Sequence, residues 1–336
     1  MFNKIYEGIK NFIKNNIGFV ITLIVMVILI TVKLPYEVEM PGGIIDLSDR
    51  ITVDGKDANI EGSFNMAYVS VVQGSIPYVL LGTILPDWDV IKVSDVTYDN
   101  ETIEDANKRD RVYLEQSKNY AIISALEAAN IDYKINNKVN SVIYITKEAN
   151  TDLKIGDNVI KCEGIEVSDV AEIKKVVAEK NVGDTVTFTV SRDGKEVLKK
   201  AKIYEEDGEK YAGVSVVTTF DIESSKDIQI KTKLSESGPS GGMMMALMIY
   251  NALTEQDLTH GKKIVGTGTI SVDGTVGEIG GIKYKVMGAV KNKADVILVP
   301  KENYEEAMEV KKAKKYVIEI VKVEKLQDAI DYLEGI

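Results

Sequence analysis

The chain has 336 residues, of which 45% are hydrophobic and 28% charged, so it is long enough for two or three folded domains. The formal net charge of -11 is spread along the sequence, which argues against a nucleic-acid partner and offers no broad attraction to anionic lipid. The single cysteine, Cys162, excludes an internal disulfide, and no cluster of cysteine and histidine predicts a metal site.

The first distinctive segment is an apolar stretch from Ile17 to Val32, interrupted only by a glycine and two threonines. A helix of this length spans roughly 24 Å at about 1.5 Å per residue, slightly less than the ~30 Å hydrocarbon core of a bilayer. The side chains of Lys14 and Lys33 can extend towards the lipid headgroups and make up the difference. We therefore predict a transmembrane anchor at residues 13–34.

The residues around this stretch bear on its processing and its orientation. A cleaved signal peptide also begins with basic residues and an apolar run, but no small-x-small cleavage pattern follows here, which favours an uncleaved anchor. Lys4, Lys10 and Lys14 precede the stretch, and the acidic Glu37 soon follows it. By the positive-inside rule, residues 1–12 are predicted to be cytoplasmic and the rest of the chain extracytoplasmic, at the cell membrane.

Residues 35–130 show two kinds of pattern. From Tyr36 to Thr97, short alternating stretches are broken by Gly, Pro and Asp, which predicts a β-rich region. From Glu104 to Ala129, hydrophobic residues recur at helical intervals. We predict a helix there that packs against or connects its neighbours.

Residues 131–206 contain the segments LKIGDNVI (153–160) and GDTVTFTVSRDG (183–194), on either side of a helical pattern. The order of strand, turn, strand, helix and hairpin, together with these segments, resembles a PDZ domain. The resemblance implies β-augmentation, in which an extended peptide adds to an open sheet edge. A β-rich spacer without a ligand is the alternative. We predict no individual peptide-binding residue, because no carboxylate-binding loop is obvious.

The stretch from Ser237 to Leu253, SGPSGGMMMALMIYNAL, places Ser240 between a Gly-Pro turn and an apolar run of helical length. Backbone N–H groups of Gly241 and Gly242 and the positive end of the helix dipole could stabilise an oxyanion beside this hydroxyl, so Ser240 is a candidate nucleophile. A loop in which the serine merely caps the helix is the structural alternative. The methionines that follow are predicted to lie in the core.

A second glycine-containing segment, 277–303, begins another helix, with Lys283 and Lys285 in its first turn. A desolvated, neutral lysine amine can activate a serine. The single histidine, His260, lies in a polar loop, which argues against a Ser-His-Asp triad. The residues therefore indicate Ser-Lys chemistry without choosing between the two lysines.

Three segments, GPSGG (238–242), TGTIS (267–271) and GGIKYK (280–285), resemble the GPSAG, TGxIS and GGIxxK blocks of Lon-type serine proteases in order and spacing. The resemblance implies a Lon-type proteolytic domain at residues 207–336, with Ser240 as nucleophile and Lys285 as general base. It also suggests that Thr267 helps to hold the lysine, although an ordinary strand threonine is an equal alternative.

Two positions depart from the family pattern. Gly241 replaces the usual alanine, a change we expect to be tolerated, and Ser237 stands where an acidic residue is usual, with Glu236 beside it. No third catalytic carboxylate is therefore predicted.

Taken together, the anchor, the PDZ-like domain and the Lon-like domain resemble the bacterial membrane-anchored PDZ/Lon proteases, which include pheromone-processing members. No GxxxxGK[ST] phosphate loop or complete dinucleotide fingerprint is present, so we expect no ATP, metal or other cofactor. The implied function is an ATP-independent serine endopeptidase that processes extracytoplasmic peptides or exposed protein segments. Lon-type domains often assemble into rings, so the resemblance is compatible with a homo-oligomer.

We predict an α+β fold overall, with the anchor, the β-rich region, the PDZ-like domain and the Lon-type domain in that order. Two other functions stay open at this point. One is a catalytically inactive Lon-fold and PDZ scaffold that binds peptides at the membrane surface. The other is a hydrolase that uses Ser240 on small esters.

Overall fold

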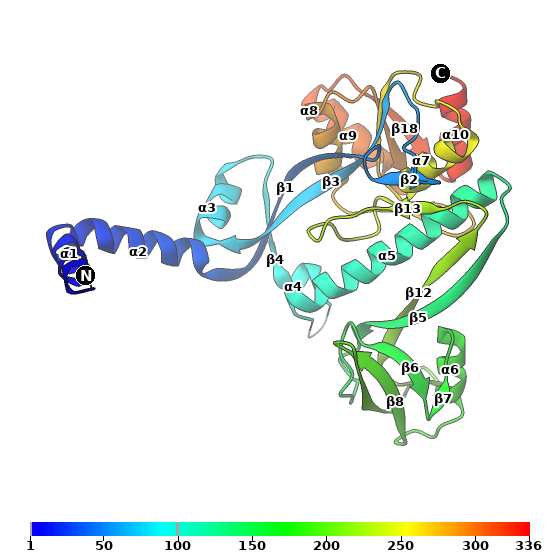
Figure 1. Cartoon of the computed structure of the whole chain (residues 1–336), viewed down its shortest axis with the longest axis horizontal. Coiled ribbons are helices and arrows are strands. Elements are labelled where there is room, and N and C mark those ends of the chain that lie inside the picture. Colours follow the sequence, from blue (N-terminus) through cyan, green and yellow to red (C-terminus); the bar gives the residue numbers. More distant parts are fainter. Residues whose placement is uncertain (1, 99–100) are drawn as a thin grey trace. The chain divides into compact units, whose positions relative to one another are not determined.

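The computed structural model describes residues 2–98 and 101–336 (Figure 1). Contacts divide the chain into two compact units. The first unit comprises Met1–Met40 and Ser70–Val96, and the second comprises Pro41–Val69 and Thr97–Ile336. Helix and strand are mixed within the chain, so the predicted mixed class is confirmed.

The first unit contains two N-terminal helices and a small sheet. Strands β1 and β4 pair antiparallel from Tyr36↔Lys92 to Glu39↔Asp89, and a helix, α3, precedes β4. Strands β1 and β3 continue from this unit into the second. The elements are α1 (Phe2–Asn15), α2 (Ile17–Thr31), β1 (Lys33–Asp46), β3 (Ser63–Ser75), α3 (Ile76–Ile84), β4 (Asp89–Lys92) and α4 (Val93–Val96).

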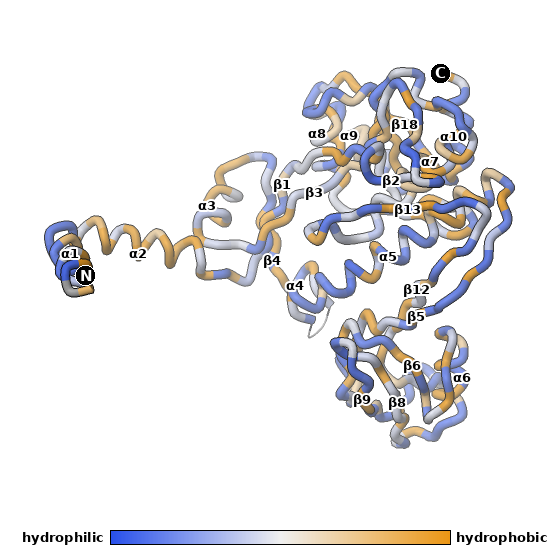
Figure 2. Tube along the Cα trace, in the orientation of Figure 1, coloured by the Kyte–Doolittle hydropathy of each residue, from blue (hydrophilic) through white to orange (hydrophobic). Residues whose placement is uncertain are grey.

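The predicted anchor, residues 13–34, is divided among three elements. Its first residues belong to α1, its apolar centre forms α2, and its last two lie in β1. Asn16 separates the helices and donates its side-chain amide to the carbonyl of Phe12 at 2.9 Å. Apart from one glycine and two threonines, helix α2 is apolar, and none of its residues is buried (Figure 2).

Among the described residues, no single helix has both the length and the apolar character needed to cross a membrane. The segments Lys4–Asn15 and Ile17–Thr31 meet that requirement only as a pair, with a bend of 89° between them.

The second unit contains a parallel sheet with helices on both faces. Its strands follow the order β18-β17-β14-β3, and β3 joins β14 from Ser63↔Lys263 to Met66↔Gly266. Ile264 packs in the cluster that includes α7 and α10, whereas Val265 packs with α8 and α9. The elements are β14 (Lys263–Gly266), β17 (Val296–Pro300), β18 (Glu319–Val323), α7 (Gly242–Thr254), α8 (Ile282–Lys291), α9 (Tyr304–Lys314) and α10 (Leu326–Glu334).

Helix α7 is the centre of this core. Met243, Met244, Met245 and Met248 are at most 1% exposed, so the prediction that these methionines pack in the core is confirmed. Apolar side chains all round a helix are expected when every face is covered. Ser240, the nucleophile candidate, therefore precedes a helix that packs against other parts of the core on all sides.

Segments that precede the PDZ-like region complete the second unit. Helix α5 (Ile103–Ala128) is close to the predicted 104–129 helix and packs against α7, and β2 (Ile51–Val53) pairs with β13 (Ile228–Ile230). Together with β3, these elements place parts of the predicted β-rich region within the core of the C-terminal sheet. The C-terminal domain is thus discontinuous in sequence.

The PDZ-like region has its own sheet and core. The strand order is β12-β5-β6-β8-β9, and Phe188, Val186 and Val190 are fully buried against helix α6 and the neighbouring strands. Its elements are β5 (Tyr133–Ile145), β6 (Asn158–Cys162), β7 (Ile165–Glu166), α6 (Val170–Ala178), β8 (Thr185–Arg192), β9 (Lys195–Lys202), β10 (Tyr204–Glu206), β11 (Glu209–Tyr211) and β12 (Val214–Ser224).

Strand β12 belongs to this sheet. It pairs with β5 from Val214↔Ile145 to Ser224↔Tyr133 (Figure 1), although the sequence pattern assigned residues 214–217 to the Lon-like domain. The strand then continues towards β13 and the Ser240 segment. Strands β5 and β12 therefore form one antiparallel ribbon whose outer end belongs to the PDZ-like sheet.

Cys162 provides a chemical probe of this region. Burial, reinforced by the nearby Glu163 carboxylate, raises the pKa of the Cys162 thiol to about 11. Because the thiolate is the reactive form, Cys162 should resist a maleimide at pH 8 and react only when the domain unfolds. Mass spectrometry at increasing urea concentrations measures the fraction of Cys162 that is labelled. A Ser168→Cys variant, with an exposed position, should be labelled at once, and rapid labelling of native Cys162 would contradict the packing described.

Candidate active site

The segment that carries Ser240, residues 237–241, is called here the nucleophile loop. Ser240 is half-buried and lies two residues before the first residue of α7. The two residues before it are hydrogen-bonded to α5. The Gly238 amide donates to the carbonyl of Asp110 at 2.9 Å. The hydroxyl of Ser117 donates to the carbonyl of Pro239 at 3.0 Å. Gly238 has φ +85°, a conformation that favours glycine. The loop is therefore held by its backbone on both sides of the turn.

Some backbone N–H groups around the serine donate a hydrogen bond within the protein, and others do not. The amide of Gly242 donates to the carbonyl of Pro239, and that of Met243 donates to the carbonyl of Gly268, each at 3.1 Å. Within the described part of the chain, the amides of Ser240 and Gly241 donate no hydrogen bond. These two amides, next to the start of α7, are candidate donors to a ligand oxygen.

The space around Gly241 is limited on one side. A Cβ at this position would lie 2.7 Å from the sulfur of Met66, on β3. An alanine here would therefore need a small shift of that flexible side chain, which is a modest cost for the residue usual in the resembling family.

Lys285, in the first turn of α8, is brought to the nucleophile loop through Thr267. The amine is almost fully buried, at 3% exposure, and donates to the hydroxyl of Thr267 at 3.0 Å. The same hydroxyl donates to the carbonyl of Ser240 at 3.1 Å, and the amide of Gly268 donates to that carbonyl at 2.8 Å. One continuous hydrogen-bonded path thus joins Lys285, Thr267 and the backbone of Ser240.

The start of α8 is fixed by a buried amide. Asn303 accepts a hydrogen bond from the Ile279 amide at 2.9 Å and donates one to the Ile279 carbonyl at 3.0 Å. Asn303 is 3% exposed, so both bonds are shielded from water. These two hydrogen bonds hold the glycine segment that leads into α8. They thereby fix the position of the helix that carries Lys285.

The other candidates named by the sequence lie in different surroundings. Lys283 is half-buried, with its amine 5.1 Å above the ring of Tyr284. His260 is exposed, and its ring nitrogen Nε2 lies 3.0 Å from the carbonyl of Leu333. The Glu236 carboxylate is paired with Arg50 at 3.2 Å and accepts from the Lys233 amide, so it supports the loop backbone.

Two serines on α5 were not identified from the sequence. Besides the bond from Ser117, Ser124 donates its hydroxyl to the carbonyl of Ser271 at 2.7 Å, in the TGTIS segment. Both serines are 3% exposed and lie on the helix face that also buries Leu114 and Ala121. The sequence signal that could have identified these two serines is the recurrence of small polar residues on an otherwise apolar helix face.

Across residues 2–98 and 101–336, no group of three or more His, Cys, Asp or Glu side chains is arranged to hold a metal ion.

Comparison with known proteins identifies two domains. Residues 212–334 match the Lon protease (S16) C-terminal proteolytic domain, and residues 111–203 match the PDZ domain. The first match contains all three sequence blocks and the second begins inside α5.

Individual relatives agree with these matches. A Lon protease of Mesomycoplasma hyopneumoniae (strain 232) is 35% identical over 100 residues, which is 30% of this chain and 11% of that protein. A Lon protease of Clostridioides difficile (strain 630) is 32% identical over 124 residues, which is 35% of this chain and 16% of that protein. The matched part therefore spans between 11% and 16% of the length of these two relatives.

Among solved structures, the PDZ domain of the SdrC-like protein from Listeria monocytogenes is similar over 25% of this chain and 93% of its own, with 20% identity and a TM-score of 0.23. By the two family matches, the chain contains a PDZ domain and a C-terminal proteolytic domain of the Lon (S16) type.

Proposed function

We propose that this protein is an ATP-independent, membrane-anchored serine endopeptidase in which Ser240 is the nucleophile and Lys285 the general base. The observation that carries the proposal is the hydrogen-bonded path from the buried Lys285 amine through the Thr267 hydroxyl to the backbone carbonyl of Ser240, which brings the base candidate to the nucleophile loop.

Each step of the proposed reaction uses a group of this chain. Burial disfavours the charged form of an amine, so Lys285 can accept the Ser240 proton as the hydroxyl oxygen attacks the scissile carbonyl carbon. The amides of Ser240 and Gly241 would donate to the resulting oxyanion. The protonated amine then gives its proton to the leaving nitrogen. In the second half, Lys285 takes a proton from the water that attacks the acyl-enzyme and passes it to the departing Ser240 oxygen, which restores the hydroxyl and the neutral amine.

Anchoring in a membrane is supported by α2. All 15 residues of this helix are uncharged and none is buried, although burying such a surface is strongly favourable. Lys4, Lys10 and Lys14 precede it, so we place the N-terminus in the cytoplasm and the PDZ and proteolytic domains on the outer side. With α2 in a membrane, the bend of 89° at Asn16 would let α1 lie along the cytoplasmic surface.

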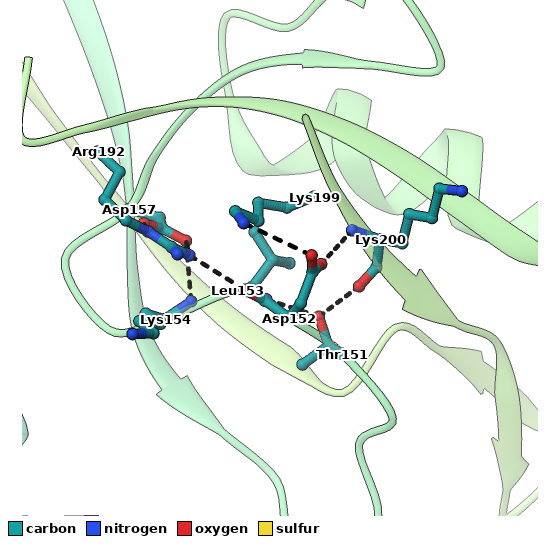
Figure 3. Close-up of polar contacts among 8 residues, drawn as sticks. All are labelled: Thr151, Asp152, Leu153, Lys154, Asp157, Arg192, Lys199 and Lys200. Atoms are coloured by element: carbon teal, nitrogen blue, oxygen red, sulfur yellow. Dashed lines mark hydrogen bonds and ion pairs between the residues drawn. The ribbon is translucent and has the colours of Figure 1, made fainter. Parts of the chain in front are cut away.

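The PDZ domain would recruit substrate peptides by β-augmentation, and its two sheet edges differ in availability. The outer edge of β9 is occupied at Lys200 by Thr151 and Asp152 (Figure 3). Asp152 donates its amide to the Lys200 carbonyl at 3.1 Å, Thr151 donates its hydroxyl to the same carbonyl at 2.7 Å, and the Lys202 amide donates to the Asn150 carbonyl at 2.9 Å. The opposite edge is β12, which ends the sheet order. Its Phe220 amide and carbonyl already bond the side chain of Asn119 on α5, so we propose the part from Val214 to Thr218 for a peptide strand.

Cleavage without nucleotide tests the proposed activity. The purified full-length chain should hydrolyse members of a panel of fluorescence-quenched peptides at the same rate with and without ATP and Mg²⁺, and should act weakly on small esters. Extended peptides should be cut faster than folded proteins, because the described chain shows no motor for unfolding. Dependence on ATP, or activity on esters alone, would contradict the proposal.

Removal of the Ser117 hydroxyl should weaken catalysis without unfolding the protein. The bond to the Pro239 carbonyl holds the nucleophile loop. One such bond contributes about 0.5–1.5 kcal/mol, so Ser117→Ala should lower kcat/KM by about 2–12-fold, mainly through kcat. Gln116→Ala, on the neighbouring residue, is the matched control. Unchanged kcat in Ser117→Ala at an unchanged melting temperature would show that the loop does not need this bond.

A further inference from the structure

Helix α3 presents an apolar surface that packing within the first unit does not cover. Residues 75–86 contain no charged side chain, and no residue of α3 is buried. Exposure is largest at Ile84 (74%) and Leu80 (57%). A helix at a water-exposed surface normally has a polar outer face, and this helix has none.

Only one side of α3 is used for packing against the sheet. A Cβ at Gly82 would lie 2.5 Å from Cγ2 of Val90 and 3.5 Å from Cγ1 of Val38, so Gly82 sits directly on β1 and β4. Leu80 and Ile84 each lie two residues from Gly82, which places them on the opposite side of a 3.6-residue helix. The contact with the sheet therefore directs these two side chains away from the unit.

Two neighbours of α3 indicate what covers this surface. Helix α3 contacts α2, the exposed apolar helix, within the same unit (Figure 2). Trp88, the single tryptophan of the chain, follows α3 and stacks with Tyr78 at 6.4 Å between ring centroids. Tryptophan and tyrosine are enriched at membrane–water boundaries, where one end of the ring is apolar and the other is wet.

We infer that α3 is a second membrane element, which lies in the interfacial layer of a lipid bilayer beside α2. Leu80 and Ile84 enter the acyl region, and the Trp88–Tyr78 pair sits at headgroup level. At nine residues the helix is too short to span, and its length suits an interfacial position. This inference rests on the proposed membrane anchoring by α2.

The single tryptophan makes the inference directly measurable in the full-length protein. The chain is reconstituted into vesicles of phosphatidylcholine and phosphatidylglycerol, with or without lipids brominated on the acyl chains. Trp88 fluorescence should be blue-shifted and quenched by the brominated lipid. In a Leu80→Glu/Ile84→Glu variant the quenching should be lost, while the protein still floats with the vesicles through α2.

A matched control is Val317→Glu, which changes a side chain that is 99% exposed in the second unit and should leave Trp88 quenching unchanged. If the wild-type protein floats but Trp88 is not quenched, or if the double variant keeps its quenching, α3 faces water or another protein copy and the inference is wrong while anchoring by α2 stands. If the wild-type protein does not float, the anchor and the inference both fail.

Discussion

Replacing Ser240 with alanine should abolish peptide hydrolysis, with a loss on the order of 10³-fold or more in kcat. The substitution removes the attacking oxygen, whereas the backbone that positions it stays in place through Gly238, Pro239 and Gly268. The melting temperature should therefore change little. Cleavage of quenched peptides, followed with the purified variant, is the measurement.

Ser237→Ala is the matched control for this change. Ser237 is exposed, lies three residues earlier in the same loop, and should be dispensable for activity. Retained hydrolysis in Ser240→Ala would refute the nucleophile assignment. Loss of hydrolysis together with unchanged cellular function would instead favour the inactive scaffold.

Replacing Lys285 with methionine should lower kcat by about 10²–10⁴-fold, the range associated with loss of a general base. Methionine keeps much of the length of the side chain in a site that is 3% exposed, so the core around α8 stays filled. The Thr267 hydroxyl loses the amine as a donor but keeps the Ser240 carbonyl as its acceptor. Activity should therefore fall far more than stability, which paired kinetic and melting measurements can show.

Lys283→Met provides the comparison, because it makes the same chemical change two residues away. The Lys283 amine is half-buried above the Tyr284 ring, outside the path that reaches Ser240. This variant should keep most of the activity. The reverse pattern, with Lys283 essential and Lys285 dispensable, would overturn the assignment of the base.

Local patterns in the sequence were sufficient to predict some elements, and they supplied candidate residues for the site. The helical spacing at 104–129 predicted α5 to within one residue at each end, and the methionine-rich run correctly predicted a buried helix. The resemblance of three short blocks chose Lys285 over Lys283, which periodicity could not do. The assignments of Ser240 and Lys285 as catalytic residues stay predictions, although Thr267 links the two positions.

Pairing between distant segments could not be predicted in this way. Strand β3 joins β14 across about 200 residues, and β12 pairs with β5 around the inserted PDZ sheet. An alternating pattern shows that a strand has a buried face but does not name its neighbour, because the backbone hydrogen bonds of a strand are the same for any partner. The roles of Ser117 and Asn303 depend on such distant contacts.

The most direct test of the Ser240–Lys285 mechanism needs no knowledge of the natural substrate. A fluorophosphonate reacts covalently with a serine only when that hydroxyl is activated, and intact-mass and peptide mass spectrometry locate the adduct. The mechanism predicts one adduct, on Ser240, which is absent from Ser240→Ala and strongly reduced in Lys285→Met but not in Lys283→Met. An adduct on another residue, or labelling of Ser240 at the full rate without Lys285, would contradict it.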